Sequence, residues 1–230
     1  MKPFPLNIFI IHYSKLVDRK DHMDNEISKW SLDKFPITFE TRFDQEVMTD
    51  EQVKGSIDLE SFKTTTGRPM KKGEQSLSLK YKSILSSLEE LPDDHYALVL
   101  EDDVVFKEDP VPYISALLSH CSSNHIDFDC VFMGEAWIRR GDNRNIFFKK
   151  DHPATNGLCT VLYKVPAAKR LLAHLKKERV SHALDWHFNK VFEELDFNVY
   201  WSKAITSHGS VMAMYDDNRK GLKSVLRDSY

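Results

Sequence analysis

The amino-acid sequence predicts a three-layer α/β fold, in which helices cover both faces of a mostly parallel central sheet. Short apolar segments rich in β-branched residues alternate along the chain with longer segments whose apolar residues recur at helical spacing. This alternation of strands and helices is typical of sheets in which most strands are parallel. The chain has 230 residues, enough for a full hydrophobic core, and we expect residues 1–230 to form a single domain.

The first half of the chain supplies apolar strands separated by amphipathic helices. The expected strands are 6–11, 36–43 and 97–100, and the expected helices are 17–30, 74–91 and one that starts at 110. Helix 74–91 has the clearest pattern, because Leu77, Tyr81, Ile84 and Leu88 fall on one helical face. The helix that starts at 110 follows Asp109, a typical N-cap residue.

The alternation of strands and helices continues in the second half of the chain. The expected strands are 128–133, 158–163 and 197–201, and the expected helices are 166–175 and 184–195. Three further segments are polar and show no clean period: 44–72, 136–155 and 215–230. We expect 44–72 to be a long, divergent and mobile surface loop, 136–155 to be a basic loop, and 215–230 to be a poorly packed tail.

Three consecutive acidic residues interrupt the apolar segment 97–106. Glu101, Asp102 and Asp103 follow an Ala-Leu-Val-Leu strand and precede a second apolar run. Such acids repel one another unless a positive group neutralises them, and the carboxyl ends of strands are where α/β sheets bind ligands. A hard divalent cation that holds a diphosphate would fit this place. The alternative is a strand that simply runs into a solvated acidic turn.

Metal ligands can be proposed from the spacing of these acids. Side chains alternate along a strand, so Asp103 and Glu101 share a face and are the first candidates, whereas Asp102 points away toward a ribose or a loop amide. His208 could complete the metal shell, although a lone histidine is more often an ordinary loop residue. No glycine-rich phosphate loop is present, so basic side chains such as Arg19 would have to assist the metal.

Several segments, in order, resemble glycosyltransferase family 25, which includes lipooligosaccharide and collagen galactosyltransferases. The segment Leu100-Glu101-Asp102-Asp103-Val104 matches the L-E-D-D-V core of that family and is the specific part of the resemblance. Suggestive matches are Asp18-Arg19 with Met23, Gly73-Glu74, Asn156-Gly157 with Ala168, Leu171 and Leu172, and Asp185. The chain departs from the family at Lys80 and Tyr81, where the family has Ser-His, and at Ser76, which replaces a glycine.

The resemblance implies a GT-A fold, a UDP-sugar donor that carries galactose or glucose, and Mn²⁺ or Mg²⁺. It also implies inversion at the anomeric carbon and a glycan or glycoconjugate as the acceptor. The residues expected to contact the donor are Glu101, Asp102, Arg19, Gly73 and Glu74.

An inverting transfer needs a general base that takes the proton of the acceptor hydroxyl. Asp185 lies at the start of an expected helix, where the helix dipole would favour its ionised form. Glu135 follows the 128–133 strand and is the competing base. Asp185 could instead do no more than cap its helix.

Two other functions remain open at this point. A sugar-1-phosphate nucleotidyltransferase would use the same acids, although it usually grips its triphosphate with an early glycine-rich basic loop that is missing here. A non-catalytic GT-A-like module that binds nucleotide or glycan is the third hypothesis. The departures at Lys80 and Tyr81 keep it open.

Composition narrows the partners. The formal net charge is -3, which argues against nucleic acid as the main partner. No apolar run approaches the roughly 20 residues that cross a bilayer, and the three cysteines show no CxxC spacing. We expect a cytoplasmic protein without a transmembrane segment, able to make peripheral contact with the inner face of a membrane.

Aromatic and basic residues add candidates for acceptor binding. Trp137, Trp186 and Trp201 could stack on sugar rings, although packing in the core is the more frequent use of tryptophan. The basic stretch 139–150 could hold a phosphorylated or acidic acceptor, or could simply be a solvated face.

Overall fold

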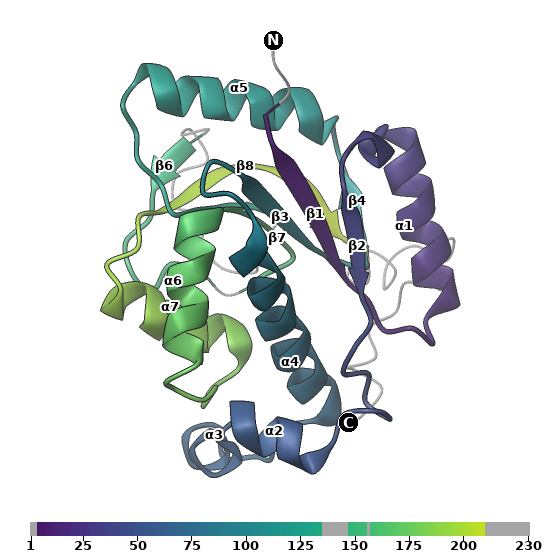
Figure 1. Cartoon of the computed structure of the whole chain (residues 1–230), viewed down its shortest axis with the longest axis vertical. Coiled ribbons are helices and arrows are strands. Elements are labelled where there is room, and N and C mark those ends of the chain that lie inside the picture. Colours follow the sequence, from purple (N-terminus) through teal and green to yellow (C-terminus); the bar gives the residue numbers. More distant parts are fainter. Residues whose placement is uncertain (1–3, 135–146, 156, 210–230) are drawn as a thin grey trace.

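The computed structural model describes residues 4–134, 147–155 and 157–209. Within them, eight strands form one sheet in the order β2-β1-β3-β7-β5-β8-β4, with β6 paired to β8 (Figure 1). The strands are β1 (Leu6–Ile11), β2 (Ile37–Glu40), β3 (Tyr96–Glu101), β4 (Val104–Phe106), β5 (Cys130–Gly134), β6 (Phe147–Lys149), β7 (Thr160–Lys164) and β8 (Val199–His208). The helices are α1 (Val17–Lys29), α2 (Asp50–Ser56), α3 (Leu59–Thr66), α4 (Lys72–Ser87), α5 (Pro110–Ser123), α6 (Val165–Leu175) and α7 (Leu184–Glu194).

Most strands of the sheet share one direction. β1 pairs in parallel with β2 and β3, and β5 pairs in parallel with β8. β7 lies antiparallel between β3 and β5, while β4 and β6 are antiparallel to β8. The strands β1, β2, β3, β5 and β8 therefore point the same way, which confirms the prediction of a mostly parallel sheet.

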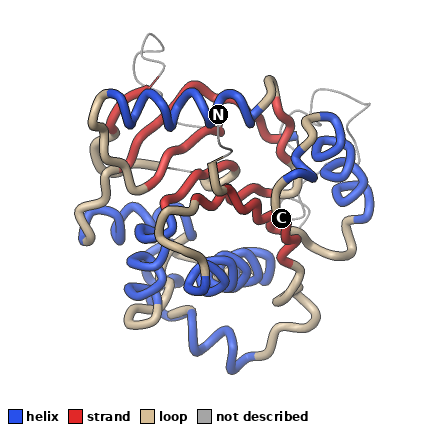
Figure 2. Tube along the Cα trace, turned by 45° about the horizontal axis from the view of Figure 1, so that its top comes forward, coloured by secondary structure: helices blue, strands red, loops and turns tan. Residues whose placement is uncertain are grey.

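Helices cover both faces of the sheet, and each face has its own apolar core. One core joins the sheet to α4, α6 and α7, and the other joins it to α1 and α5. Figure 2 shows helices on both sides of the strands. This arrangement confirms the three-layer α/β fold. None of the helices in the described ranges is long and apolar enough to cross a membrane, and the compartment in which the protein works stays a prediction.

Local sequence explains where the main helices begin. The Asp109 carboxylate accepts a hydrogen bond from the backbone N–H of Val111 at 3.0 Å, and Pro110 occupies the first turn of α5. In α4 the Glu74 carboxylate accepts from the backbone N–H of Lys71 at 2.9 Å. The buried stripe of α4 includes Ile84 and Leu85, as its spacing predicted.

The segment 44–72 is not the irregular loop that the sequence predicted, because it contains α2 and α3. Each helix has its own cap: Thr49 accepts from the backbone N–H of Gln52 at 3.3 Å, and Asp58 accepts from that of Ser61 at 3.0 Å. Each is only seven or eight residues long and has a single buried side chain, Val53 or Phe62. One buried residue in two turns leaves no apolar period to read in the sequence.

Part of the segment 136–155 also differs from the expected loop. Its residues 147–149 form β6, and the Phe147 ring stacks on the Tyr200 ring of β8 with centroids 4.7 Å apart. β8 itself continues to His208, well beyond the expected end of the strand at 201. The predicted tail 215–230 lies outside the described residues.

Candidate functional site

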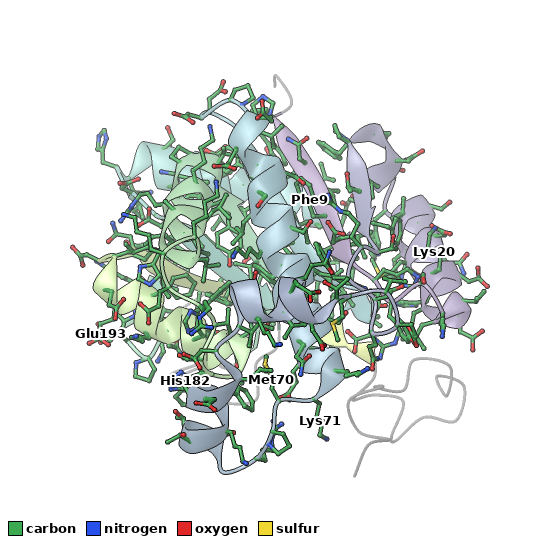
Figure 3. All side chains as sticks on the ribbon, turned by 60° about the horizontal axis from the view of Figure 1, so that its bottom comes forward. Phe9, Lys20, Met70, Lys71, His182 and Glu193 are labelled. Carbon is green, nitrogen blue, oxygen red and sulfur yellow. The ribbon has the colours of Figure 1, made fainter. Side chains whose placement is uncertain are left out.

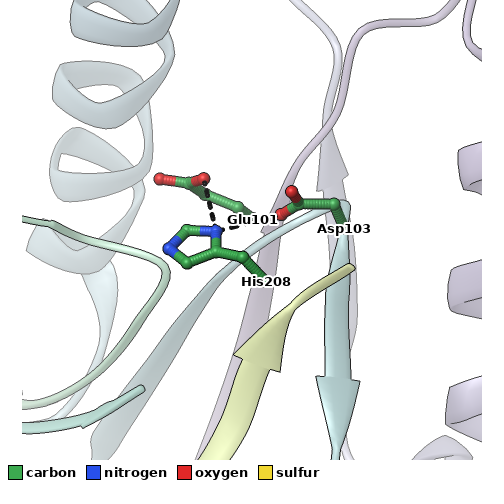
Figure 4. A group of neighbouring side chains, drawn as sticks. All are labelled: Glu101, Asp103 and His208. Atoms are coloured by element: carbon green, nitrogen blue, oxygen red, sulfur yellow. Dashed lines mark ion pairs between the residues drawn. The ribbon is translucent and has the colours of Figure 1, made fainter. Parts of the chain in front are cut away.

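Three side chains that could bind a metal meet where strands of the sheet end. β3 ends at Glu101, a turn carries Asp103, and the pairing of β4 with β8 places His208 opposite Val104. His208 Nδ1 lies 3.6 Å from Asp103 Oδ1 and 3.9 Å from Glu101 Oε2 (Figure 4). One ligand atom from each of the three residues lies within 4.8 Å of the others.

The electrostatics of this cluster show that its acids need positive charge. Burial raises the pKa of Glu101 to about 7; the charge of His208 opposes this rise and the carboxylate of Asp103 adds to it. Burial would lower the pKa of His208, but its ion pair with Asp103 and its contact with Cys159 outweigh burial and raise that pKa to about 12. The imidazolium of His208 therefore sits between two carboxylates as their counter-charge.

The donor set fits a divalent cation. Two carboxylates and one imidazole suit Mn²⁺, which accepts both oxygen and nitrogen ligands, better than Mg²⁺, which strongly prefers oxygen. His208 would have to lose its proton before Nδ1 could serve as a ligand. The predicted metal ligands Asp103, Glu101 and His208 are thus brought together by the fold, although they come from segments about a hundred residues apart in the chain.

Asp102, between the two acidic candidates in the sequence, is buried and is bound by other side chains of the protein. Arg19 Nη1 donates to its Oδ1 at 2.5 Å, and His12 Nδ1 lies 2.8 Å from its Oδ2. The backbone N–H of Tyr13 also approaches Oδ2, at 3.4 Å, so one of the two partners expected for Asp102, a loop amide, is present. Burial alone would lower the pKa of Arg19, but the charges of Asp102 and Asp103 outweigh it and raise that pKa. Arg19 therefore forms a buried ion pair with Asp102.

A second buried ion pair lies beneath the loop that follows β1, and sequence reasoning missed it. The ammonium group of Lys80 contacts the Asp44 carboxylate and the carbonyl oxygen of His12. Asp44 Oδ2 in turn accepts from the backbone N–H of Ser14 at 3.0 Å. One signal was available, because Lys80 lies three residues after Leu77 and four before Ile84, on the buried face of α4.

Gly73 and Glu74 belong to α4, and Asp185 belongs to α7. Gly73 and Glu74 are in the first turn of α4, where the Glu74 carboxylate accepts from both terminal nitrogens of Arg68 at 2.6 and 2.7 Å. The charge of Glu74 acts on Asp185, which places these two carboxylates near each other.

The pKa of Asp185 moves in the direction opposite to the one the sequence predicted. The N-cap of α7 is Ala183, so Asp185 lies in the first turn, and its Oδ1 accepts from the backbone N–H of Trp186 at 2.9 Å. Burial nevertheless raises the pKa of Asp185, because desolvation outweighs the backbone hydrogen bonds. The competing base, Glu135, lies outside the described residues.

Comparisons with known proteins give a likeness of fold and nothing closer. No protein-family model matches the chain, and no curated protein sequence matches it. Among the solved structures that resemble it are two whose match covers most of both chains. One is A197 from STIV, with a TM-score of 0.44 and 14% identity, covering 89% of this chain and 85% of that one. The other is a glycosyltransferase involved in the glycosylation of the major capsid of PBCV-1, with a TM-score of 0.46 and 11% identity, covering 89% and 94%. Such distant likenesses assign no residue roles, and membership of family 25 gains no support from them.

Proposed function

We propose that this protein is a metal-dependent, inverting glycosyltransferase that moves a sugar from a UDP-sugar to a glycan or glycoconjugate. The observation that carries the proposal is the convergence of Glu101, Asp103 and His208 at the ligand-binding edge of an α/β sheet. The L-E-D-D-V segment that resembles family 25 supplies two of these three residues.

Each of these residues has a defined task in the proposed reaction. Asp103, Glu101 and His208 would hold Mn²⁺ or Mg²⁺, and such a cation neutralises the charge that develops on a departing diphosphate. Asp102 ties Arg19 on α1 and His12 after β1 to the end of β3, so it keeps the edge of the site in place. Arg19, Gly73 and Glu74 stay candidates for contacts with the donor.

The transfer reaction requires one general base and one leaving group. The acceptor hydroxyl oxygen forms a bond to the anomeric carbon, while the bond between that carbon and the diphosphate oxygen breaks and UDP leaves. The proton of the hydroxyl passes to a carboxylate, for which Asp185 and Glu135 are the candidates. The raised pKa of Asp185 suits this task, because it makes the carboxylate a stronger acceptor of protons than an exposed aspartate.

Binding of UDP with and without Mn²⁺ tests the proposal. We expect wild-type protein to bind UDP more tightly in Mn²⁺, and Asp103→Asn to lose that gain while keeping its fold. Glu178→Gln is the matched control, because Glu178 belongs to a separate acid–histidine cluster, with His174 and Glu194. Isothermal titration calorimetry measures both affinities. If Asp103→Asn keeps the Mn²⁺-dependent gain, the site does not use this cluster.

A further inference from the structure

A pocket of about 620 Å³ lies between the end of α3 and the first turns of α7. Its walls come from Thr65 and Thr66 on α3, from His152 and Pro153, and from the segment around Trp186. Figure 3 shows His182 and Glu193, which also line it, on the face of the molecule that carries Met70 and Lys71 at the start of α4. The volume is in the range of small-molecule sites.

Trp186 stands out among the tryptophans of the described residues because its side chain faces solvent. Its exposed fraction is 50%, whereas Trp201 is 1% exposed. Removing the apolar surface of an indole from water is favourable in free energy, so an exposed indole that borders a pocket is well placed to contact a ligand. Packing in the core, the alternative use that the sequence left open, applies to Trp201 and not to Trp186.

The pocket is formed before any ligand arrives. Asn189 Oδ1 accepts from the backbone N–H groups of Ala154 and Thr155 at 2.7 and 2.8 Å, and its Nδ2 donates to the carbonyl of Thr155 at 2.5 Å. Trp201 Nε1 donates to the carbonyl of Ala154 at 2.7 Å. These bonds fix the wall that carries Pro153 to α7 and β8, so binding needs little reordering.

We propose that this pocket binds a neutral sugar ring, stacked on the indole of Trp186. The C–H face of a pyranose matches the apolar indole, and its hydroxyls can both donate and accept hydrogen bonds. The rim supplies partners of both kinds, with the ammonium of Lys190, the carboxylate of Glu193 and the imidazole of His182. A nucleotide fits less well, because the charge of Lys190 is already paired with Glu178 and its neighbour in the pocket is the acid Glu193.

The bound sugar would belong to the acceptor, and this assignment rests on the proposed function. Trp186 directly follows Asp185 in the first turn of α7, and the Asp185 carboxylate accepts from the N–H of Trp186. A glycan seated on Trp186 therefore occupies the same helical turn as the candidate base, and its further units would have to extend from the pocket toward Asp185. Asp185 itself does not line the pocket. Binding of a sugar ring, by contrast, does not depend on the reaction.

Titration of the wild-type protein with lactose, cellobiose and maltose tests the proposal by NMR of ¹⁵N-labelled indoles, without UDP or metal. We expect the Trp186 indole signal, assigned by its absence in Trp186→Phe, to shift with disaccharide and not with mannitol, a polyol that has no ring face. Trp186→Ala should weaken binding at least about tenfold, and Trp186→Phe less, because a smaller ring still stacks. Val17→Ala, which trims another exposed apolar side chain, should leave affinity unchanged.

The proposal is overturned if no disaccharide shifts the Trp186 signal, if uridine shifts it while the sugars do not, or if Trp186→Ala binds as wild type does. The wild-type titration decides between these results even if that variant fails to fold. Failure of the glycosyltransferase proposal is seen separately, as UDP binding that ignores Mn²⁺. Sugar binding without that dependence would make the protein a carbohydrate-binding module.

Discussion

Lys80 carries a positive charge into a part of the protein that is nearly closed to water. Its side chain is 2% exposed and that of its partner Asp44 is 7% exposed. Two buried charges of opposite sign stabilise each other, whereas either one alone would be a desolvated charge that has lost its counter-ion. The pair therefore fixes α4 to the loops after β1 and β2, because neither residue can move away without leaving the other unpaired.

We expect Lys80→Met to lower the free energy of unfolding by about 3–5 kcal/mol, because it strands the Asp44 carboxylate in the interior. Lys176→Met is the control, since Lys176 pairs with Glu89 at 2.7 Å on the surface and should contribute less than about 1 kcal/mol. Urea denaturation measures both. The double variant Lys80→Met/Asp44→Asn should lose less than the two single changes added together. Equal losses for Lys80→Met and Lys176→Met would contradict the buried pair.

Asp185→Asn should reduce the rate of sugar transfer by about 10²–10⁴ while leaving UDP affinity unchanged, because the amide cannot take a proton. The wild-type rate should rise with pH, since the base acts in its ionised form. Burial raises the pKa of Asp185, so this rise should lie above the pH range of an ordinary aspartate. A radiolabelled transfer assay at several pH values measures it. If Glu135→Gln loses transfer and Asp185→Asn keeps it, the base is Glu135.

For single residues, the sequence predicts the acidic candidates of the site better than the distant side chains that contact them. Glu101 and Asp103 could be chosen as candidate ligands because they end an apolar strand within three residues of each other. His208 could be suggested, but its position beside them depends on the register of β4 against β8, which no local pattern reveals. Lys80 was visible as a lysine on an apolar helical face. Its partner Asp44 was not, because it lies in a different loop.

The helices of this protein fall into two groups that differ in how they are stabilised. α4 and α6 run for eleven residues or more and bury a stripe of apolar side chains, so their period was predictable. α2 and α3 are short and have no such stripe. Each is stabilised by its N-terminal cap and by one buried side chain. Short helices of this kind are stabilised mainly by tertiary contacts, so the sequence of segment 44–72 carries no helical period from which they could be predicted.

Phe62→Ala should destabilise the protein by about 3–5 kcal/mol, because the ring is 0% exposed and lies in the core beneath α3. Lys63→Ala, at an exposed position of the same helix, is the control and should change stability by less than about 0.5 kcal/mol. Thermal unfolding followed by circular dichroism compares the two. A loss below about 1 kcal/mol for Phe62→Ala would mean that α3 is only loosely packed against the core.

The whole molecule has two apolar cores that share one sheet. Ile84 on α4 belongs to one core and Ile114 on α5 to the other, and both are 0% exposed. The strands between them contribute alternate side chains to the two cores, so loss of one core exposes the back of the other. The fold class was predictable because this alternation of strands and helices is a property of the entire chain and tolerates errors in single elements.

Ile84→Ala and Ile114→Ala should each cost about 2–5 kcal/mol and should each shift the same single unfolding transition. Far-ultraviolet and near-ultraviolet circular dichroism during urea unfolding would give coincident curves for both variants if residues 1–230 form one cooperative domain. Ile27→Ala, at a half-buried position on α1, serves as a milder reference. Two separated transitions in either variant would mean that the cores unfold independently.

β8 lies between β5 and β4 and also pairs with β6, although it is the last strand of the described chain. During synthesis, the ribosome therefore releases β4, β5 and β6 before the strand that joins them exists. Until β8 arrives, those strands present open edges, which are the surfaces that invite wrong pairing between nascent chains. His208, at the end of β8, is the last of the three cluster residues to be synthesised, so a nascent chain that lacks β8 cannot complete the Glu101–Asp103–His208 cluster.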